Sequence, residues 1–292
     1  MRYELKRSFS ASELADHIGA QFSGADLMVD SIAAVGDRQP GALTYWQEKA
    51  PPPDELPLSA CVLVRKEAIH QQSGQACFLV CRNPRMEFIR LLRWFEREKL
   101  FGVVSRGEVH TSAEIHPTAV VESGASIGAG CCIGPVAHIT SWTSLGKNVN
   151  VGSGSVVGRS GFGYERDEKG VPVAFPHFGR VVIEDNCDIG SNTTIARGNL
   201  TDTTIGQHVK VDDQVYVAHN SIIGDSSMIA GGVRICGSVV IGSQCWIGAG
   251  ATILQNLEVG NRAVVGLGAV VVRSVAAETV VAGNPARVLR QS

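Results

Sequence analysis

The sequence lacks an excess of charge of either sign. Its 292 residues include 26 Lys and Arg against 28 Asp and Glu, a formal net charge of −2. Proteins that bind nucleic acid or anionic membranes through their overall field carry a clear positive excess. Neither class of partner is expected, whereas 44% hydrophobic residues supply ample material for a buried core.

Long apolar runs are also missing. No window approaches the length of about 18 uncharged apolar residues that would indicate a transmembrane helix. The N-terminal stretch MRYELKRSFSASELADHIG carries charges where a secretory signal needs an apolar segment. The sequence therefore predicts no transmembrane segment and a cytoplasmic protein.

Cysteine and histidine are not clustered at metal-ligand spacing. Of the eight cysteines, Cys131 and Cys132 are adjacent, and the others lie within or near apolar stretches, which favours buried, reduced thiols. Cys77 and Cys81 have the closest ligand-like spacing, but no second pair accompanies them. We expect no metal and no permanently bound cofactor.

The first hundred residues have the pattern of a small α/β domain. Ser10 and Glu13 are spaced as a capping box, in which each side chain satisfies a backbone N–H at the start of a helix. The apolar segments 61–66 and 76–81 predict short buried strands. Segment 84–99 repeats apolar residues at helical spacing.

Beyond residue 113 the dominant signal is an aliphatic residue at every sixth position. A six-residue rung, with Gly or Asn at corners where φ is positive and small residues beside the aliphatic one, is typical of a three-sided solenoid. Each coil stacks its aliphatic residues on those of the next, which predicts a columnar core. The repeated positions are Ile115, Val121, Ile127, Ile133, Ile139, Leu145, Val151, Val157, Ile183, Ile189, Ile195, Ile205, Val211, Val217, Ile223, Ile229, Ile235, Ile241, Ile247, Ile253, Val259, Val265 and Val271.

The repeat sets the expected domain boundaries and is interrupted twice. We expect a small α/β domain at 1–105, which could bind a nucleotide, a β-helix at 113–275 and a C-terminal tail at 276–292. The interruptions predict loops at 158–182 and 196–204. Insertions in solenoids are loops on one face, often the binding face.

Four segments make a family resemblance specific. They resemble the UDP-3-O-acylglucosamine N-acyltransferases, and the stretch FSASELADHIGAQFSG near the start is similar to that family's N-terminal domain. The four are GFGYERD (161–167), FGRVVIEDNCDIGSNTTIARG (178–198), KVDDQVYVAHNSIIG (210–224) and IAGGVRICGS (229–238).

The resemblance implies a fold and a reaction. The fold would be mainly β, a left-handed parallel β-helix preceded by the small α/β domain, and three chains would form a homotrimer. The reaction would move an acyl group from acyl-CoA or acyl carrier protein to the amine of a nucleotide-linked amino sugar, for lipopolysaccharide or another surface glycan.

The resemblance also implies a catalytic pair. His219 would be the general base, a role that suits an imidazole because it titrates near neutral pH. Gly237 would offer its backbone N–H to the oxyanion. Because Val217 points inward, His219 and Asn220 are expected at an outward corner. The histidines not expected to act as catalysts are His116, His138, His177 and His208.

Several polar residues are expected to bind substrate. Arg197 could pair with a phosphate, and Asp212 or Asp213 could orient His219, although one rung separates them. A solvated surface role remains an alternative for each. The expected substrate-binding residues are Tyr45, Asn192, Arg197, Asp212, Asn220 and Asn256.

The chain departs from the family pattern at four places. Beside Tyr45, which matches a base-stacking aromatic residue, Glu48 replaces an Asn and Pro51 replaces a second aromatic residue. Ala196 stands where the family has Asp, and Asn256 where it has a second histidine. The closing stretch GNPARVLRQS resembles coenzyme A dependent sugar acetyltransferases rather than the helices of the lipid A enzyme. This favours coenzyme A as the carrier.

Two other functions are compatible with the same residues. One is the lipid A enzyme itself, which would use a long hydroxyacyl chain from acyl carrier protein. The other is a noncatalytic hexapeptide scaffold or sugar-nucleotide sensor, since a fold does not fix a function.

Overall fold

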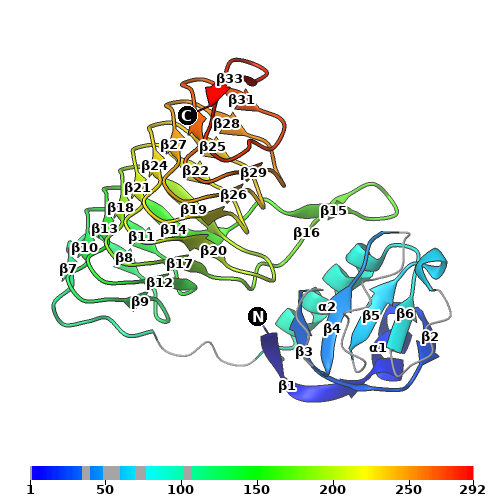
Figure 1. Ribbon diagram of the computed structural model, residues 1–292. Coiled ribbons are helices and arrows are strands. Elements are labelled where there is room, and N and C mark those ends of the chain that lie inside the picture. The colour runs from blue at the N-terminus through cyan, green and yellow to red at the C-terminus, as the bar shows by residue number, and fades with distance from the viewer. Residues whose placement is uncertain (1, 35–39, 49–59, 70–76, 102–106, 292) are drawn as a thin grey trace. The chain divides into compact units, whose positions relative to one another are not determined.

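The computed structural model describes residues 2–34, 40–48, 60–69, 77–101 and 107–291. These fall into two compact units. The first comprises residues 1–103 together with 163–176, and the second comprises 104–162 and 177–292. Figure 1 shows the first unit as a sheet with helices and the second as a stack of β-coils.

A mixed six-stranded sheet forms the centre of the first unit. Its strands follow the order β1 (Arg2–Ser10), β3 (Met28–Ala33), β4 (Ala42–Tyr45), β5 (Cys61–Val64), β6 (Cys77–Val80) and β2 (Gln21–Gly24). The helices are α1 (Ala11–Ile18), α2 (Pro84–Arg97) and the short 3-10 helix η1 (Lys66–Ala68). The expected strands at 61–66 and 76–81 and the helix at 84–99 are confirmed.

Helix α1 begins at the predicted cap. The Ser10 hydroxyl accepts a hydrogen bond from the Glu13 N–H at 3.1 Å. The Glu13 carboxylate does not complete a capping box, because it pairs with Arg7 at 3.1 Å instead. Gly19 ends the helix with φ +66°, a left-handed conformation that glycine adopts without steric cost.

The second unit is a parallel β-helix with three faces. The first face contains β7 (Glu114–Ile115), β10 (Cys132–Ile133), β13 (Asn150–Val151), β18 (Asp188–Ile189), β21 (Lys210–Val211), β24 (Met228–Ile229), β27 (Trp246–Ile247), β30 (Val264–Val265), β32 (Thr279–Ala282) and β33 (Arg287–Gln291). The second contains β8 (Val120–Val121), β11 (His138–Ile139), β14 (Val156–Ser160), β19 (Thr194–Arg197), β22 (Tyr216–Val217), β25 (Arg234–Ile235), β28 (Thr252–Ile253) and β31 (Val270–Val271). The third contains β9 (Ser126–Ile127), β12 (Thr143–Leu145), β17 (Val181–Ile183), β20 (Thr203–Ile205), β23 (Ile222–Ile223), β26 (Val240–Ile241) and β29 (Glu258–Val259).

The aliphatic residues of the repeat point into the column. In most coils they are the second residue of a two-residue strand and are nearly inaccessible to solvent, while the first residue faces outward. The register keeps like positions in contact, as in the pairing of Val217 with Ile235 and of Ile235 with Ile253. The fold class and the columnar core predicted from the six-residue spacing are therefore confirmed.

Both interruptions of the repeat lie on the same edge of the β-helix. We call the turns between the first and second faces the first edge, and those between the second and third faces the second edge. Residues 161–180 connect β14 to β17, and residues 198–202 connect β19 to β20. Both loops therefore leave the column at the second edge.

The longer loop contains a hairpin that belongs to the first compact unit. Its strands are β15 (Tyr164–Arg166) and β16 (Pro172–Ala174), which pair antiparallel. Residues 163–176 group with the N-terminal residues. The expected division at residue 105 is therefore incomplete, because a later segment of the chain joins the first unit.

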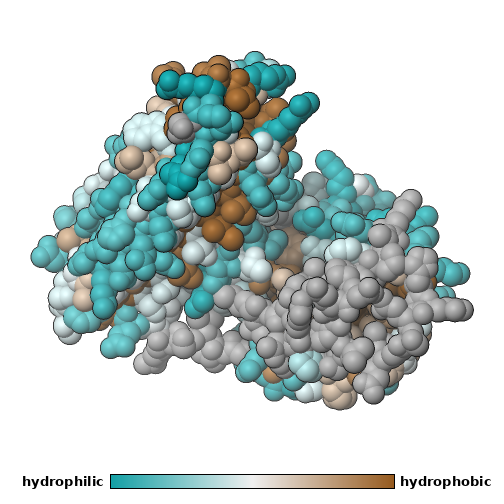
Figure 2. Space-filling model, viewed as in Figure 1, coloured by the Kyte–Doolittle hydropathy of each residue, from teal (hydrophilic) through white to brown (hydrophobic). Residues whose placement is uncertain are grey.

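Residues 276–292 are not a simple tail. Strand β32 continues the first face by pairing parallel to β30, and β33 folds back antiparallel onto β32. Figure 2 shows apolar side chains gathered at this end of the β-helix, where Leu267, Val288 and Leu289 are exposed. The sequence pattern missed this coil because the aliphatic spacing changes after Val271.

The cysteines are all unpaired thiols, as expected, but not all are buried. Cys131, Cys187 and Cys245 are inaccessible in turns of the β-helix, whereas Cys132 faces solvent on β10. The helices within the described ranges are too short or too polar to span a membrane.

Strand β23 offers a matched test of the column. Ile223 is buried and its neighbour Ile222 points outward with 44% of its surface exposed. We expect Ile223→Ala to lower the free energy of unfolding by about 2–5 kcal/mol, because it removes buried methyl groups and leaves a cavity. Ile222→Ala should cost about 1 kcal/mol or less. Urea denaturation at one protein concentration measures both, and equal losses would contradict the assigned faces.

Candidate functional site

Consecutive coils place polar and glycine residues along the second edge. His219 and Asn220 follow β22, Gly237 follows β25, and Asn256 follows β28. The coil before them contributes the 198–202 loop. His219 is therefore at an outward turn, where the sequence predicted it, and it is half-buried.

A hydrogen-bond network holds the imidazole of His219. Its Nδ1 lies 2.9 Å from Oδ1 of Asn220. The Asn220 amide in turn donates from Nδ2 to the carbonyl oxygen and the hydroxyl of Thr201, at 3.0 and 2.7 Å. Its Oδ1 also accepts from the Asn199 N–H at 3.3 Å.

This network selects one tautomer of His219. A carbonyl oxygen can only accept and a backbone N–H can only donate, so Thr201 and Asn199 fix which end of the Asn220 amide is oxygen. That oxygen faces Nδ1 of His219, which must therefore carry the proton. The lone pair is left on Nε2, which can accept a proton from a ligand.

Two glycines enclose the imidazole. A Cβ at Gly237 would lie 2.8 Å from Cε1 and 2.9 Å from Nε2 of His219, and a Cβ at Gly161 would lie 2.8 Å from Cβ and 2.9 Å from Cδ2. Real side chains do not approach so closely. Both positions therefore need glycine if the ring is to stay where it is, and Gly237 lies beside Nε2 of His219.

His177 is a site residue that the sequence pattern did not identify. Its side chain is buried, and its ring lies edge-on to that of His219, with centroids 5.5 Å apart and an interplanar angle of 71°. His177 belongs to the aperiodic 161–180 loop, where spacing gives no information about direction. The only signal was that this loop interrupts the repeat.

Arg197 lies at the same edge, where it was expected. Its guanidinium donates to the Ser160 hydroxyl at 3.2 Å and lies over the Trp142 ring, 5.1 Å from its centroid. Cation–π and hydrogen-bond contacts hold the planar fork in place. Arg197 is thus a positioned cation beside the 198–202 loop.

Asn192 and Asp212 are not brought near His219 within one chain. They follow β18 and β21, so they lie on the first edge. Asp212 Oδ1 accepts from the Asp213 N–H, and Asp213 accepts from the Ser191 N–H, so these contacts are local to that edge. Within one chain, Asp212 and Asp213 do not orient His219, because the next rung carries the chain to another edge. Asn220 is the residue that contacts Nδ1.

Asn256 lies on the second edge, one coil beyond Gly237. Its N–H donates to the Gly237 carbonyl at 3.1 Å, and its side chain is exposed. The φ of +61° is the left-handed corner conformation that Asn tolerates well. Asn256 therefore forms a corner of the β-helix, and its role in substrate binding stays a prediction.

Tyr45 belongs to the first unit, within an aromatic cluster. Its ring centroid lies 5.0 Å from that of Phe88 and 6.3 Å from that of Phe175. Burial raises the pKa of the Tyr45 hydroxyl, an effect that Arg85 opposes and Glu165 reinforces. Glu48 is exposed, and Pro51 lies outside the described residues.

One thiol lies beside the candidate site at the second edge. Burial raises the pKa of the Cys236 thiol, which precedes Gly237, so the neutral thiol is favoured near pH 7. No group of three or more His, Cys, Asp or Glu side chains within the described ranges is arranged to hold a metal ion.

The glycine beside His219 provides a structural test. Gly237→Ala should displace the imidazole or its own turn, because the added methyl group overlaps the ring, and overpacking costs about 1–3 kcal/mol. Gly231→Ala is the control, since its new methyl group would meet the flexible Asp212 carboxylate at 3.1 Å and the Asp213 carbonyl oxygen at an ordinary contact distance of 3.5 Å. Melting curves measure stability and the His219 ring resonances report position. An unmoved ring in Gly237→Ala would contradict the close approach.

Comparisons with known proteins agree with the fold. The bacterial transferase hexapeptide model matches residues 124–159 and 202–237. The solved UDP-N-acetylglucosamine acyltransferase of Campylobacter jejuni shares the fold, with a TM-score of 0.51 and 22% identity over 61% of this chain and 75% of that one.

Curated relatives are more similar in sequence. The UDP-3-O-acylglucosamine N-acyltransferase of Coxiella burnetii is 33% identical, with 79% of this chain and 75% of that protein covered. The enzyme of the same name from Pseudomonas paraeruginosa is 36% identical, with 79% and 72% covered. With its β-helix and this extent of identity, the chain belongs to the UDP-3-O-acylglucosamine N-acyltransferase family.

Proposed function

We propose that this protein transfers an acyl group from a thioester to the amine of a nucleotide-linked amino sugar, with His219 as the general base. The observation that carries the proposal is the free lone pair on Nε2 of His219, fixed by Asn220 and adjacent to Gly237. Membership in an N-acyltransferase family gives the reaction class. The named relatives make UDP-linked 3-O-acylglucosamine the first acceptor to test.

The acceptor must lose a proton as it attacks. The amine nitrogen forms a bond to the thioester carbon while Nε2 of His219 takes the proton from nitrogen. The imidazolium that results keeps its Nδ1–H on Asn220. Asn220 thus holds the ring in the same orientation before and after proton transfer.

The thioester oxygen becomes negatively charged in the tetrahedral intermediate. No acceptor among the described residues takes the Gly237 N–H, so that group can donate to the oxyanion. When the intermediate collapses, the C–S bond breaks and the thiolate leaves. The imidazolium can return its proton to the thiolate, so that an amide and a thiol are the products.

The remaining substrate contacts belong to the same proposal. Arg197, held by Ser160 and Trp142, is suited to a phosphate or carboxylate of the substrates. Asn192 and Asp212 contribute only through a neighbouring copy of the chain, because they lie on the first edge. The homotrimer, the cytoplasmic location and the choice between acyl-CoA and acyl carrier protein stay predictions.

Replacement of the base tests the assignment. His219→Ala should lower kcat by about 10²- to 10⁴-fold, the usual contribution of a positioned general base. His208→Ala is the control, because His208 is an exposed histidine in another turn of the β-helix. Steady-state rates with UDP-3-O-acylglucosamine measure both. A loss below about ten-fold, or binding without any turnover in the parent protein, would instead support a sugar-nucleotide sensor or scaffold.

The donor can be identified from the leaving thiol. Purified protein is supplied with the amino sugar and either acetyl-CoA or a hydroxyacyl carrier protein. We expect one thiol per amide from at least one thioester, and the faster donor identifies the carrier. Release of thiol without amide, or neither product from either donor, would contradict an N-acyltransferase.

A further inference from the structure

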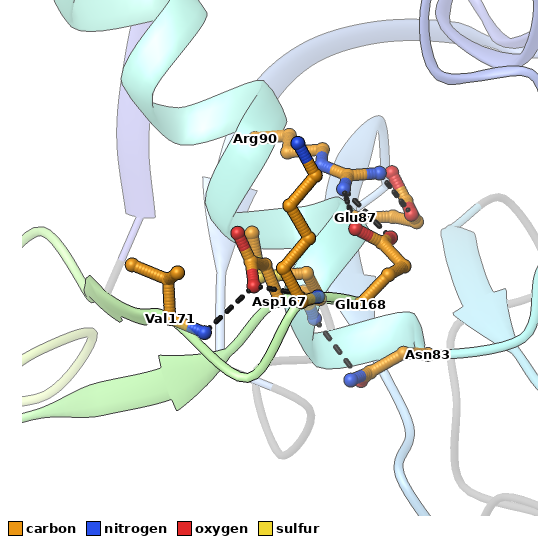
Figure 3. Close-up of polar contacts among 8 residues, drawn as sticks. Asn83, Glu87, Arg90, Asp167, Glu168 and Val171 are labelled. Atoms are coloured by element: carbon orange, nitrogen blue, oxygen red, sulfur yellow. Dashed lines mark hydrogen bonds and ion pairs between the residues drawn. The ribbon is translucent and has the colours of Figure 1, made fainter.

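Arg90 on α2 contacts the β15–β16 hairpin. This hairpin interrupts the sequence of the β-helix but belongs to the first unit. Arg90 donates to both carboxylate oxygens of Glu168 at 2.7 and 2.8 Å and to Glu87 at 2.7 Å (Figure 3). A second arginine of α2 is Arg85, whose Nε lies 3.5 Å from Oε2 of Glu165. Two ion pairs thus connect one helix to one hairpin that is distant in sequence.

The hairpin has a well-defined turn but little support of its own. The Asp167 carboxylate accepts from the N–H groups of Lys169 and Val171 at 2.9 and 2.8 Å (Figure 3). Only three residues on each strand pair. An isolated two-stranded hairpin is marginally stable in water. Its position in the first unit therefore depends on what it contacts there.

The hairpin brings one aromatic ring to Tyr45. Phe175, directly after β16, is buried, with its centroid 6.3 Å from Tyr45 and 6.2 Å from Phe88. The Arg85 guanidinium lies 5.6 Å from the Phe175 ring centroid. One side of the Tyr45 environment is thus supplied by a segment more than a hundred residues later in the chain.

We propose that the Arg90–Glu168 ion pair is a positioning device for the nucleotide of the acceptor, because it keeps Phe175 against Tyr45. This inference rests on the proposed function, with its nucleotide-linked acceptor, and on the prediction from the sequence that Tyr45 binds that nucleotide. Arg90 and Glu168 are positioning residues and need not touch the substrate. They act by keeping the Phe175 ring in place beside Tyr45 and Phe88.

The fold of α2 does not need this ion pair. The helix buries Phe88, Leu91, Leu92 and Phe95 on its inner face. The side chains of Arg90 and Glu168 are 40% and 65% exposed, so their contact adds little to global stability. Loss of the pair should therefore loosen the hairpin and leave the domain folded.

Glu168→Ala is the primary variant, because Arg90 keeps its contact with Glu87. We expect the Kd for UDP or dTDP, measured by calorimetry on the full chain, to rise about three- to five-fold, as one exposed ion pair allows. The KM for the amino sugar should rise equally, while kcat and the donor KM stay within about two-fold. Glu98→Ala is the matched control, since it removes an exposed ion pair with Arg97 on the same helix.

Two further measurements distinguish a loosened hairpin from a general loss of structure in the first unit. Trypsin should cut after Lys169 faster in Glu168→Ala than in Glu98→Ala, because the hairpin is less firmly held. In a double-mutant cycle, Arg90→Ala combined with Glu168→Ala should weaken nucleotide binding no more than Arg90→Ala alone. Glu168→Gln retains hydrogen bonding and should fall between the parent and Glu168→Ala.

The outcomes distinguish this inference from the proposed function. An unchanged nucleotide Kd in Glu168→Ala, while Tyr45→Ala weakens binding, overturns the role of the ion pair alone. Unchanged binding in both variants, or no binding of either nucleotide by the parent protein, overturns the inference together with the nucleotide site at Tyr45. A weakened Kd in a protein that acylates no amino sugar supports the inference and overturns the proposed reaction.

Discussion

The stacking of one aliphatic residue on the next, every six residues, is the constraint on which the β-helix depends. Most strands have one inward side chain, and at these positions the column holds Val, Ile or Leu. Because all three faces are used in turn, the chain must turn at an edge after every rung. Most polar side chains are thereby placed outward or at an edge, where they can contact a ligand without disturbing the core.

The candidate site follows from where that regular pattern is interrupted. Both insertions leave the column at the second edge, and both return to contact the coil of His219. The 198–202 loop supplies the partners that orient Asn220, and the longer loop supplies Gly161 and His177. A regular scaffold holds His219, and irregular segments determine its tautomer and its surroundings. This division of roles is common in proteins whose functional loops lie on rigid elements.

The longer insertion also contributes to the first unit. Its hairpin is held by ion pairs on the exposed side of α2, and Phe175 joins an aromatic cluster that contains Tyr45. Each exposed pair is weak alone. A few weak contacts suffice to position a hairpin that already has a well-formed turn, since little further ordering is required.

The sequence by itself determined the column and the family, and it predicted His219 as the base. A period of six is typical of this architecture, and the AHN segment places His219 two residues beyond an inward valine. The spacing also implies that Asp212 and His219 lie at different edges, because Val211 and Val217 belong to different faces. Only the tertiary structure decided that Asn220 orients the His219 ring, that His177 lies against it, and that Phe175 reaches Tyr45. Those contacts involve aperiodic loops, whose direction is set by long-range packing and hydrogen bonds rather than by local spacing.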